Sequence, residues 1–283
     1  MYFDLDKIKE QVEQVYEEVL AFRRDLHMHP ELSEQEIRTE EKICSRLDAL
    51  QIPYQRGVAG HGVCAVIRGT TADRTVGIRA DIDALPVAEQ TELAYASLNL
   101  GVMHACGHDM HTAILLGTAA ILKQNADTLP GTVKLFFQPS EETIGGAKQM
   151  IDAGCLEDPH VENVIALHVD PMTDLGKLKF TKGCMNAATT EMELTVRGKA
   201  CHGAHPDTGI DVLPPACSIV AALQTIVSRN LAPTTPAVVT VGTFQSGTAK
   251  NVISGEAKLG GTIRALDLDV MAYLKKRVQK IAV

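Results

Sequence analysis

The sequence has no long run of apolar residues. No such run approaches the roughly 20 residues that an α-helix needs to cross a membrane. The amino-terminal segment, MYFDLDKIKE, is charged from its fourth residue and has no apolar stretch of the signal-peptide kind. We therefore expect a protein that neither spans a membrane nor carries a signal peptide.

Paired cysteines and an excess of positive charge are also missing. The seven cysteines are an odd number, and none of them stands in a CxxC pair. Because a disulfide framework needs paired cysteines, we expect reduced thiols and a cytoplasmic protein. The formal net charge of −8 argues against nucleic acid as a partner.

Several widespread catalytic motifs do not occur. No serine stands in GxSxG, and neither HExxH nor the deaminase pattern HxE…PCxxC is found. The segment Gly60-His61-Gly62 is only a fragment of a GxGxxG loop, and there is no Walker sequence. These absences argue against nucleophile-elbow hydrolases, nucleotide-dependent redox enzymes and phosphoryl transfer.

The apolar pattern predicts an α/β domain in the first part of the chain. The chain has 283 residues, of which 45% are hydrophobic, enough for two domains or one large one. Helical spacing is found at residues 4–27 and about 33–50, where Ser33 and Glu36 resemble a capping box. Strand-type runs occur at residues 62–67, 75–79, 132–137 and 163–167, separated by helical segments near 109–125 and 144–153. This alternation favours a mostly parallel central sheet.

The pattern changes after Gly183. Residues 190–196 alternate strictly between polar and apolar, as a half-exposed strand does. A helix at about 210–229, two strands at 237–244 and 256–264 and a helical start at 268 follow. The order β-α-β-β-α suggests a small, incomplete ferredoxin-like domain. We therefore predict a catalytic domain at residues 1–184 and a second domain at residues 185–283.

A short run of metal-ligand residues stands out at residues 101–112, GVMHACGHDMHT. It contains Cys106, His104, His108, Asp109 and His111, just before a helical pattern. Thiolate, imidazole and carboxylate groups in a glycine-flexed loop suit a divalent transition metal. A single Cys or His is more often core filler or a cap, so this stretch alone leaves both interpretations open.

Polar residues follow three of the predicted strands. Asp81 and Asp83 follow the strand at 75–79, Glu141 and Glu142 follow the strand at 132–137, and His168 follows the strand at 163–167. Ligands of open α/β sheets collect beyond the carboxyl ends of the strands, so these side chains and the Cys106 loop are expected to meet there. If Glu141 and Glu142 are extended, they point in opposite directions. One can then bind a metal while the other takes a proton from an activated water.

Several runs resemble a known family. They are RRDLHMHPEL (23–32), RADIDALP (79–86), MHACGHDMHTA (103–113), FFQPSEE (136–142), ALHV (166–169), GKACHGAHPDTGID (198–211) and NVISGEAKLGGTIRA (251–265). These runs cover nearly the whole chain and follow the family's order. The chain therefore resembles the metal-dependent amidohydrolase branch of the M20 peptidase family. That branch includes aminoacylase-like, hippurate hydrolase-like and plant auxin-conjugate hydrolase-like enzymes.

The resemblance implies a site with two divalent cations, manganese or zinc, with cobalt as a further option. Its ligands would be Cys106, His108, Glu142 and His168, and Glu141 would be the general base. Asp81 and Asp83 would assist catalysis by orienting the ligands and tuning their basicity.

The resemblance also implies roles for the second domain. His202 is similar to a lid histidine that reaches the substrate carbonyl across a dimer, so we expect a homodimer formed through this domain. Asn251 and Arg264 match positions suited to holding a substrate carboxylate, the arginine by a bidentate fork.

The implied reaction is cleavage of the amide bond of an N-acyl amino acid by a metal-activated water. A metallo-dipeptidase and an N-acetyl-diaminopimelate deacetylase are close alternatives. Members of the family continue further, complete the lid and supply another ligand histidine, so we expect a carboxyl-terminally truncated chain that is weakly active at best. A non-catalytic metal-binding or dimerisation module is the alternative from another class.

Overall fold

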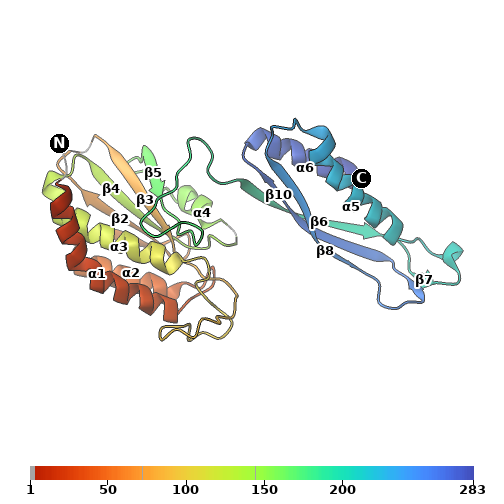
Figure 1. Ribbon diagram of the computed structural model, residues 1–283, viewed down its shortest axis with the longest axis horizontal. Helices are drawn as coiled ribbons and strands as arrows, with labels where there is room; N and C mark the ends of the chain where they lie inside the picture. The colour runs from red at the N-terminus through yellow and green to blue at the C-terminus, as the bar shows by residue number, and fades with distance from the viewer. Residues whose placement is uncertain (1–3, 72, 144) are drawn as a thin grey trace. The chain divides into compact units, whose positions relative to one another are not determined.

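The computed structural model describes residues 4–71, 73–143 and 145–283 (Figure 1). The chain divides into two compact units, Met1–Met172 and Thr173–Val283. None of the helices in the described residues is long and apolar enough to cross a membrane. The expected lack of a signal peptide concerns a segment whose residues 1–3 lie outside the described part.

The first unit is built on a five-stranded mixed sheet. Its strands are β1 (Tyr54–Val58), β2 (Gly62–Arg68), β3 (Thr75–Asp81), β4 (Thr132–Gln138) and β5 (Asn163–Ala166). They lie in the order β1-β2-β4-β3-β5. The neighbours β4, β3 and β5 are parallel, whereas β2 runs antiparallel to both β1 and β4. All strands except β2 therefore point the same way, and the predicted α/β fold with a mostly parallel sheet is confirmed.

Helices cover the two faces of this sheet unequally (Figure 1). The helices are α1 (Leu5–Met28), α2 (Ile37–Ala49), α3 (His108–Gln124) and α4 (Gly146–Asp152). The main core lies between α2, α3 and the sheet and includes Leu47, Leu116 and Phe137. Helix α1 packs closely on α3, since a Cβ on Gly117 would lie only 2.8 Å from Val19 Cγ2. A smaller core, which includes Met150 of α4, covers the other face.

Strand β5 forms one edge of the sheet. It pairs with β3 along one side, and no other described strand pairs with it. All four of its residues are exposed, including the apolar Val164 and Ile165. In the described residues, both faces and the outer edge of strand β5 are therefore exposed to solvent.

The start of α2 differs from the prediction. The helix begins at Ile37, and the Ser33 hydroxyl donates to Asp83 rather than capping it. The carboxylate of Glu31 accepts the backbone N–H groups of Arg38 and Thr39 instead. The expected capping box is therefore wrong, because a carboxylate before the helix takes the free N–H groups of the first turn.

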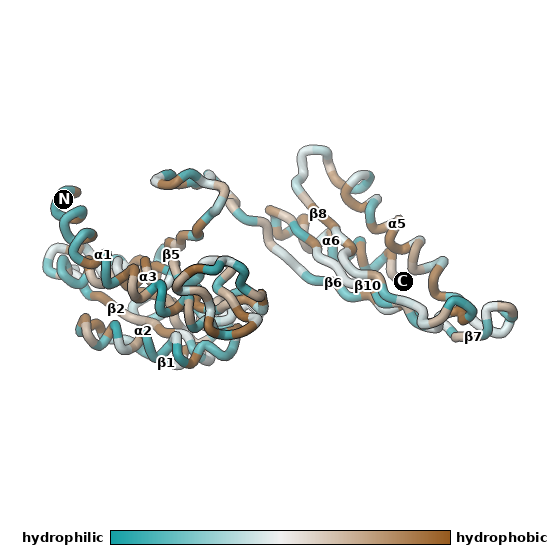
Figure 2. Tube along the Cα trace, turned by 60° about the horizontal axis from the view of Figure 1, so that its bottom comes forward, coloured by the Kyte–Doolittle hydropathy of each residue, from teal (hydrophilic) through white to brown (hydrophobic). Residues whose placement is uncertain are grey.

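The second unit contains a three-stranded antiparallel sheet with two helices. Its strands are β6 (Ala188–Arg197), β8 (Ala237–Ser246) and β10 (Glu256–Ala265), in the order β6-β10-β8. Two short strands, β7 (Cys201–His202) and β9 (Val252–Ile253), pair separately. The helices are α5 (Leu213–Asn230), along which apolar colour predominates in Figure 2, and α6 (Leu268–Ala282). Leu223, Leu274 and Ile263 form its core between helices and sheet.

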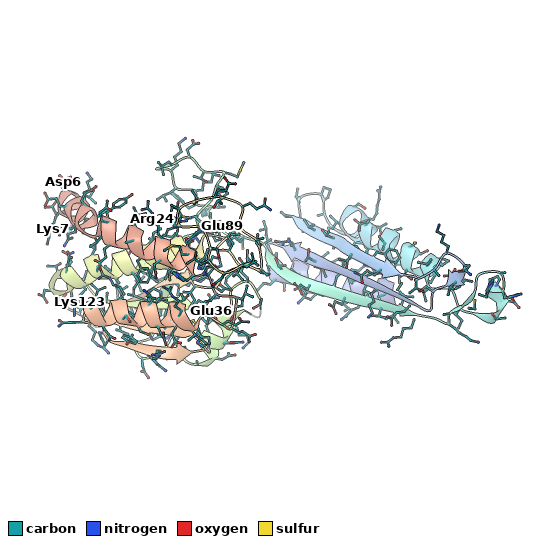
Figure 3. All side chains as sticks on the ribbon, turned by 90° about the horizontal axis from the view of Figure 1, so that it is seen from below. Asp6, Lys7, Arg24, Glu36, Glu89 and Lys123 are labelled. Carbon is teal, nitrogen blue, oxygen red and sulfur yellow. The ribbon has the colours of Figure 1, made fainter. Side chains whose placement is uncertain are left out.

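The predicted domain boundary falls in an irregular segment. No regular element is assigned between β5 and β6, and this stretch contains both the division between the units at 172/173 and the predicted boundary at 184/185. In the first unit, long loops gather at one end, where Glu36 and Glu89 lie, while Lys7 and Lys123 mark the opposite end (Figure 3). The polar residues that follow the strands lie in these loops.

Candidate metal centre

Three parallel strands deliver polar residues to one edge of the first sheet. Strand β3 ends at Asp81, β4 leads into Glu141 and Glu142, and β5 leads into His168. The first residue of α3 is His108. Because β4, β3 and β5 are parallel neighbours, their carboxyl ends lie side by side.

Gly107 allows the ligand loop to enter α3. It is the N-cap residue and has φ 86°, a left-handed conformation that glycine adopts without steric cost. A Cβ at this position would lie 2.5 Å from Val169 Cγ2. The glycine therefore permits both the turn and the close approach of the segment that carries His168.

The four predicted ligands come together. Cys106 Sγ lies 3.3 Å from His168 Nε2, and His108 Nε2 lies 3.7 Å from Glu142 Oε1. Ligand atoms of Cys106, His108 and His168 all lie within 4.8 Å of one another, and so do those of His108, Glu141 and Glu142. His108 is common to both groups.

Two of these ligand atoms are buried and have no hydrogen-bond partner among the described residues. They are His108 Nε2 and Glu142 Oε1. His108 Nδ1 lies 2.9 Å from the carbonyl oxygen of Asp83 and donates to it, which leaves the lone pair on Nε2. A buried lone pair 3.7 Å from a buried carboxylate oxygen is costly unless a proton or cation joins them. The donor set therefore fits a divalent cation.

His168, like His108, donates from Nδ1 to a backbone carbonyl oxygen and keeps its lone pair on Nε2. Its Nδ1 donates to the carbonyl oxygen of Val169 at 2.7 Å, so Nε2 carries the lone pair and faces Cys106 Sγ. Burial and the nearby Glu142 carboxylate raise the pKa of the Cys106 thiol to about 12. A cation that binds this sulfur must therefore displace its proton.

Asp83 holds two of the predicted ligands. Its Oδ1 lies 3.1 Å from His108 Nδ1, and its Oδ2 accepts the backbone N–H of Glu142 at 3.0 Å and the Ser33 hydroxyl at 2.8 Å. Burial disfavours its charged form, but these hydrogen bonds outweigh burial and lower the pKa of Asp83. Its charge is thus fixed where it orients His108 and the Glu142 loop.

The carboxylate of Asp81 is already occupied by protein groups. Its Oδ1 accepts from His111 Nδ1 at 2.6 Å, and its Oδ2 accepts from Arg79 Nη1 at 2.7 Å. Burial opposes ionisation, but the His111 hydrogen bond and the charges of His108 and Arg79 lower the pKa of Asp81 to about 2. Asp81, His108 and His111 also offer atoms within 4.8 Å of one another. A cation there would have to break the Asp81–His111 hydrogen bond.

Glu141 and Glu142 lie in a turn rather than in the extended segment that the sequence suggested. The expected opposite orientation of two extended residues therefore does not apply. The two differ in exposure all the same, since Glu141 is exposed and Glu142 is half-buried. Desolvation and the neighbouring Glu142 charge raise the pKa of Glu141, which suits a proton acceptor near neutral pH.

The other predicted site residues belong to the second unit. His202 in β7 pairs with Val252 in β9, and the carbonyl oxygen of Asn251 accepts the Gly203 N–H at 2.7 Å. His202 and Asn251 are therefore neighbours. Arg264 is the penultimate residue of β10, eight residues beyond the start of that strand at Glu256. At about 3.3 Å per residue it lies roughly 25 Å along the strand from the Asn251 end. The structure does not bring Arg264 together with the other two within one copy of the unit.

The sequence did not reveal the residues that support the Glu141–Glu142 turn. Ser140 has φ 53°, which is rare outside glycine. Its backbone N–H donates to Glu36 Oε1 at 2.8 Å, and its hydroxyl accepts the Glu34 N–H at 3.1 Å. Glu36 is fully buried, and desolvation raises its pKa. Only the burial of a glutamate before α2 could have pointed to it, and burial is not visible in the sequence.

A second buried network lies beside the ligand loop. Asp109 accepts from His27 Nδ1 at 2.8 Å and pairs with Arg23 Nε at 2.7 Å. His27 also bonds Glu89 at 3.2 Å. His104 is buried nearby, and desolvation lowers its pKa to about 4. This network fixes the first turn of α3, where His108 is located.

Fold and site together define an α/β protein with a candidate metal centre at the carboxyl edge of its first sheet. A model of the family "Peptidase family M20/M25/M40" matches residues 77–250. The N-acyl-L-amino acid amidohydrolase of Geobacillus stearothermophilus is 41% identical over 98% of this chain and 74% of its own length. The N-acetyl-L-cysteine deacetylase of Bacillus subtilis is 41% identical over 92% of this chain and 62% of its own length. This chain belongs to peptidase family M20/M25/M40, as the sequence predicted.

Similarity in structure agrees with this assignment. A crystal structure from Bacillus subtilis, described as a dinuclear metal binding peptidase from the M20 family, is 36% identical with a TM-score of 0.79. The match covers 95% of this chain and 70% of that one. The chain thus spans about two thirds of the length of the relatives it matches. The ligand cluster and this neighbour support a centre for divalent metal ions.

Proposed function

We propose that this protein is a two-cation amidohydrolase that cleaves the amide bond of N-acyl amino acids. The observation that carries the proposal is the convergence of a thiol, two imidazole nitrogens and a carboxylate. Two of these ligand atoms are buried without a hydrogen-bond partner in the described residues. The names of the relatives support the chemical class, since two of them act on N-acyl amino acids.

The proposed ligands are Cys106, His108, Glu142 and His168. This mixture of thiolate, imidazole and carboxylate suits zinc or cobalt better than magnesium or calcium, which prefer oxygen ligands. Manganese also favours oxygen ligands, and it stays a candidate through the family resemblance. When bound, such cations polarise a carbonyl group and make water more acidic. Asp83 would hold His108 and the Glu142 loop in place, and Asp81 would act through His111.

Glu141 is the proposed general base. Its carboxylate lies beside Glu142 and His108, and it is more exposed than either, so it can reach a substrate. Its raised pKa brings it closer to the pH at which it must both accept a proton and release it to the leaving amine. Replacing it by glutamine keeps the shape but removes this capacity.

Substrate binding is proposed for His202, Asn251 and Arg264 of the second unit. The histidine would donate to the substrate carbonyl oxygen, and the other two would bind its carboxylate. One small substrate cannot contact both ends of β10 in a single copy, which supports a homodimer whose two copies contribute different residues. A mixture of His202→Ala and Arg264→Ala chains should then recover part of the activity that each variant lacks. If the mixture is as inactive as its parts, the shared site is wrong.

The central test combines metal analysis with kinetics. We expect two divalent ions per chain and weak but measurable hydrolysis of an N-acyl amino acid. Glu141→Gln should lower this hydrolysis by about 10²- to 10⁴-fold, without loss of bound metal. The matched control is Glu157→Gln, which changes an exposed glutamate away from the cluster. One loosely bound ion without turnover would contradict the enzyme and favour a non-catalytic metal-binding module.

The acyl group needs a separate experiment. Two relatives named N-acetyldiaminopimelate deacetylase are each 38% identical to this chain, which favours an acetyl group and keeps that deacetylase as a second candidate. A panel of acetyl, benzoyl and indole-acetyl amino acids, N-acetyl-diaminopimelate and dipeptides separates the options. We expect N-acyl amino acids to give the highest kcat/KM; a preference for dipeptides would overturn this assignment.

A further inference from the structure

His111 is a buried imidazole with a protein partner on each ring nitrogen. It is 1% exposed. Nδ1 lies 2.6 Å from Asp81 Oδ1, and Nε2 lies 2.9 Å from the backbone nitrogen of Val169. A backbone N–H only donates, so Nε2 accepts, and the ring proton is on Nδ1 and is donated to Asp81. Neither nitrogen is therefore available to a cation without breaking a hydrogen bond.

The Val169 N–H belongs to the residue directly after the proposed ligand His168. The ring of His168 is exposed, and β5 has already ended at Ala166. Two contacts hold Val169 against α3. One is the hydrogen bond to His111 Nε2, and the other is the packing of its side chain over Gly107. The loop that carries His168 is thus attached to the loop that carries Cys106 and His108.

Asp81, at the other end of this series of hydrogen bonds, is also held in place. Asp81 Oδ2 accepts from Arg79 Nη1, and Arg79 Nε donates to Gln138 at the end of β4. Thr112 donates to the Asp81 carbonyl oxygen at 3.0 Å. Asp81 therefore cannot turn away from His111 without losing further hydrogen bonds. The connection runs from the sheet through one imidazole to the backbone of the His168 loop.

We propose that His111 is a positioning residue that holds Val169 so that His168 Nε2 faces Cys106 Sγ. This inference rests on the proposed function, because it assigns His111 a role in assembling the proposed metal centre. It also gives Asp81 a function other than metal binding, as the anchor of the His111 ring. Groups that orient metal ligands in this way commonly contribute 10- to 100-fold to metal affinity.

A double-mutant cycle with Co²⁺ tests the proposal. Binding is followed by the absorption of a Co²⁺–thiolate bond, which needs no turnover. His111→Phe keeps a ring of similar size without either hydrogen bond, and we expect it to weaken Co²⁺ binding about 10- to 100-fold. If His111 acts through His168, the double variant His111→Phe/His168→Ala binds no more weakly than His168→Ala alone. Independent effects that multiply would overturn the proposal.

Asn125→Leu is the matched control. It removes the hydrogen bonds of a buried side chain at the opposite end of α3 but leaves the Asp81–His111–Val169 hydrogen bonds intact. We expect a lower melting temperature with a Co²⁺ affinity close to that of the unmodified chain. A control variant that loses as much affinity as His111→Phe would show that any damage to this helix is sufficient, and would overturn the specific role.

A second measurement uses the unmodified chain, so it does not require any variant to fold. The ¹⁵N chemical shifts of the His111 ring in the metal-free chain report which nitrogen carries the proton. We expect a protonated Nδ1 and an unprotonated Nε2, whereas the opposite tautomer would overturn the proposal.

If the unmodified chain binds no Co²⁺ through Cys106, the proposed function fails. If it binds and His111→Phe binds equally well, only the role of His111 fails.

Discussion

Replacing Glu36 tests whether the loop of the proposed base depends on one buried carboxylate. Glu36 is fully buried, one of its oxygens accepts the Ser140 N–H at 2.8 Å, and the other has no partner among the described side chains and backbone. Glu36→Ala leaves the Ser140 N–H without its acceptor. Glu36→Gln keeps an amide oxygen for this N–H and removes the charge.

The expected losses differ between the two variants. A buried N–H without an acceptor costs about 1–3 kcal/mol, and each lost methylene adds about 0.8 kcal/mol. Removing a buried carboxylate that has only one partner offsets part of this. We therefore expect Glu36→Ala to lower the free energy of unfolding by about 2 kcal/mol. Glu36→Gln should be at least as stable as the unmodified chain at pH 7.

The pH dependence gives the sign of the charge effect. Burial raises the pKa of Glu36 above its ordinary value of 4.5, so ionisation destabilises the folded state. Below pH 4.5 the carboxyl group is neutral in both states. The penalty grows as the pH rises above 4.5 and is complete above the raised pKa. The advantage of Glu36→Gln should therefore be absent near pH 4 and present at pH 7.

Urea unfolding followed by circular dichroism is the appropriate assay, because the chain has no tryptophan to report by fluorescence. Glu41→Ala is the matched control, an exposed position on the same helix that should change stability by less than about 0.5 kcal/mol. The reasoning is refuted if Glu36→Ala unfolds like the unmodified chain, or if Glu36→Gln loses as much stability as Glu36→Ala.

Three further predictions concern the first unit. Asp81→Asn should destabilise the metal-free chain by about 2 kcal/mol at pH 7, because the pKa of Asp81 falls from 3.8 to about 2. The depressed pKa stabilises the folded state above pH 3.8, and this stabilisation is lost as the pH falls through 2. Urea unfolding should therefore show a smaller loss of stability for Asp81→Asn at pH 2 than at pH 7. Equal losses at both pH values would contradict this prediction. Gly107→Ala should cost about 1–2 kcal/mol and weaken Co²⁺ binding, because φ 86° and the Val169 contact exclude a Cβ; an unchanged melting temperature and Co²⁺ affinity would count against this close approach. Arg23→Met should cost about 3 kcal/mol, since it removes one partner of the buried Asp109 charge, and a change below 0.5 kcal/mol in the same urea assay would show that His27 alone satisfies it.

Most regular elements of the first unit were predictable because their apolar runs are long and bounded by turn residues. Strand β1 was missed because YQRGV at 54–58 has apolar residues only at its ends. The two-residue strands β7 and β9 are too short to leave a periodic signal. Local patterns therefore sufficed wherever one element buried a continuous face.

The convergence of the candidate ligands could also be predicted from the sequence, since Cys106 and His108 lie close together in one segment and the others follow strands. The supporting residues could not. Ser140 and Glu36, or Val169 and His111, are far apart in the sequence, and their hydrogen bonds depend on how the loops cross at the sheet edge. The two glutamates of the turn show the same limit, because their extended conformation was assumed from a strand that ends at Gln138.

The edge of strand β5 that no described strand covers can form further β-sheet hydrogen bonds. A strand whose outer N–H and C=O groups face solvent is a template for hydrogen bonding to any extended segment that approaches it. Val164 and Ile165 add an apolar surface on both sides of that template. Self-association of this chain at that edge would join separate copies into sheet-paired aggregates, and a fusion that shields residues 163–166 would keep concentrated samples of the chain monodisperse for spectroscopy.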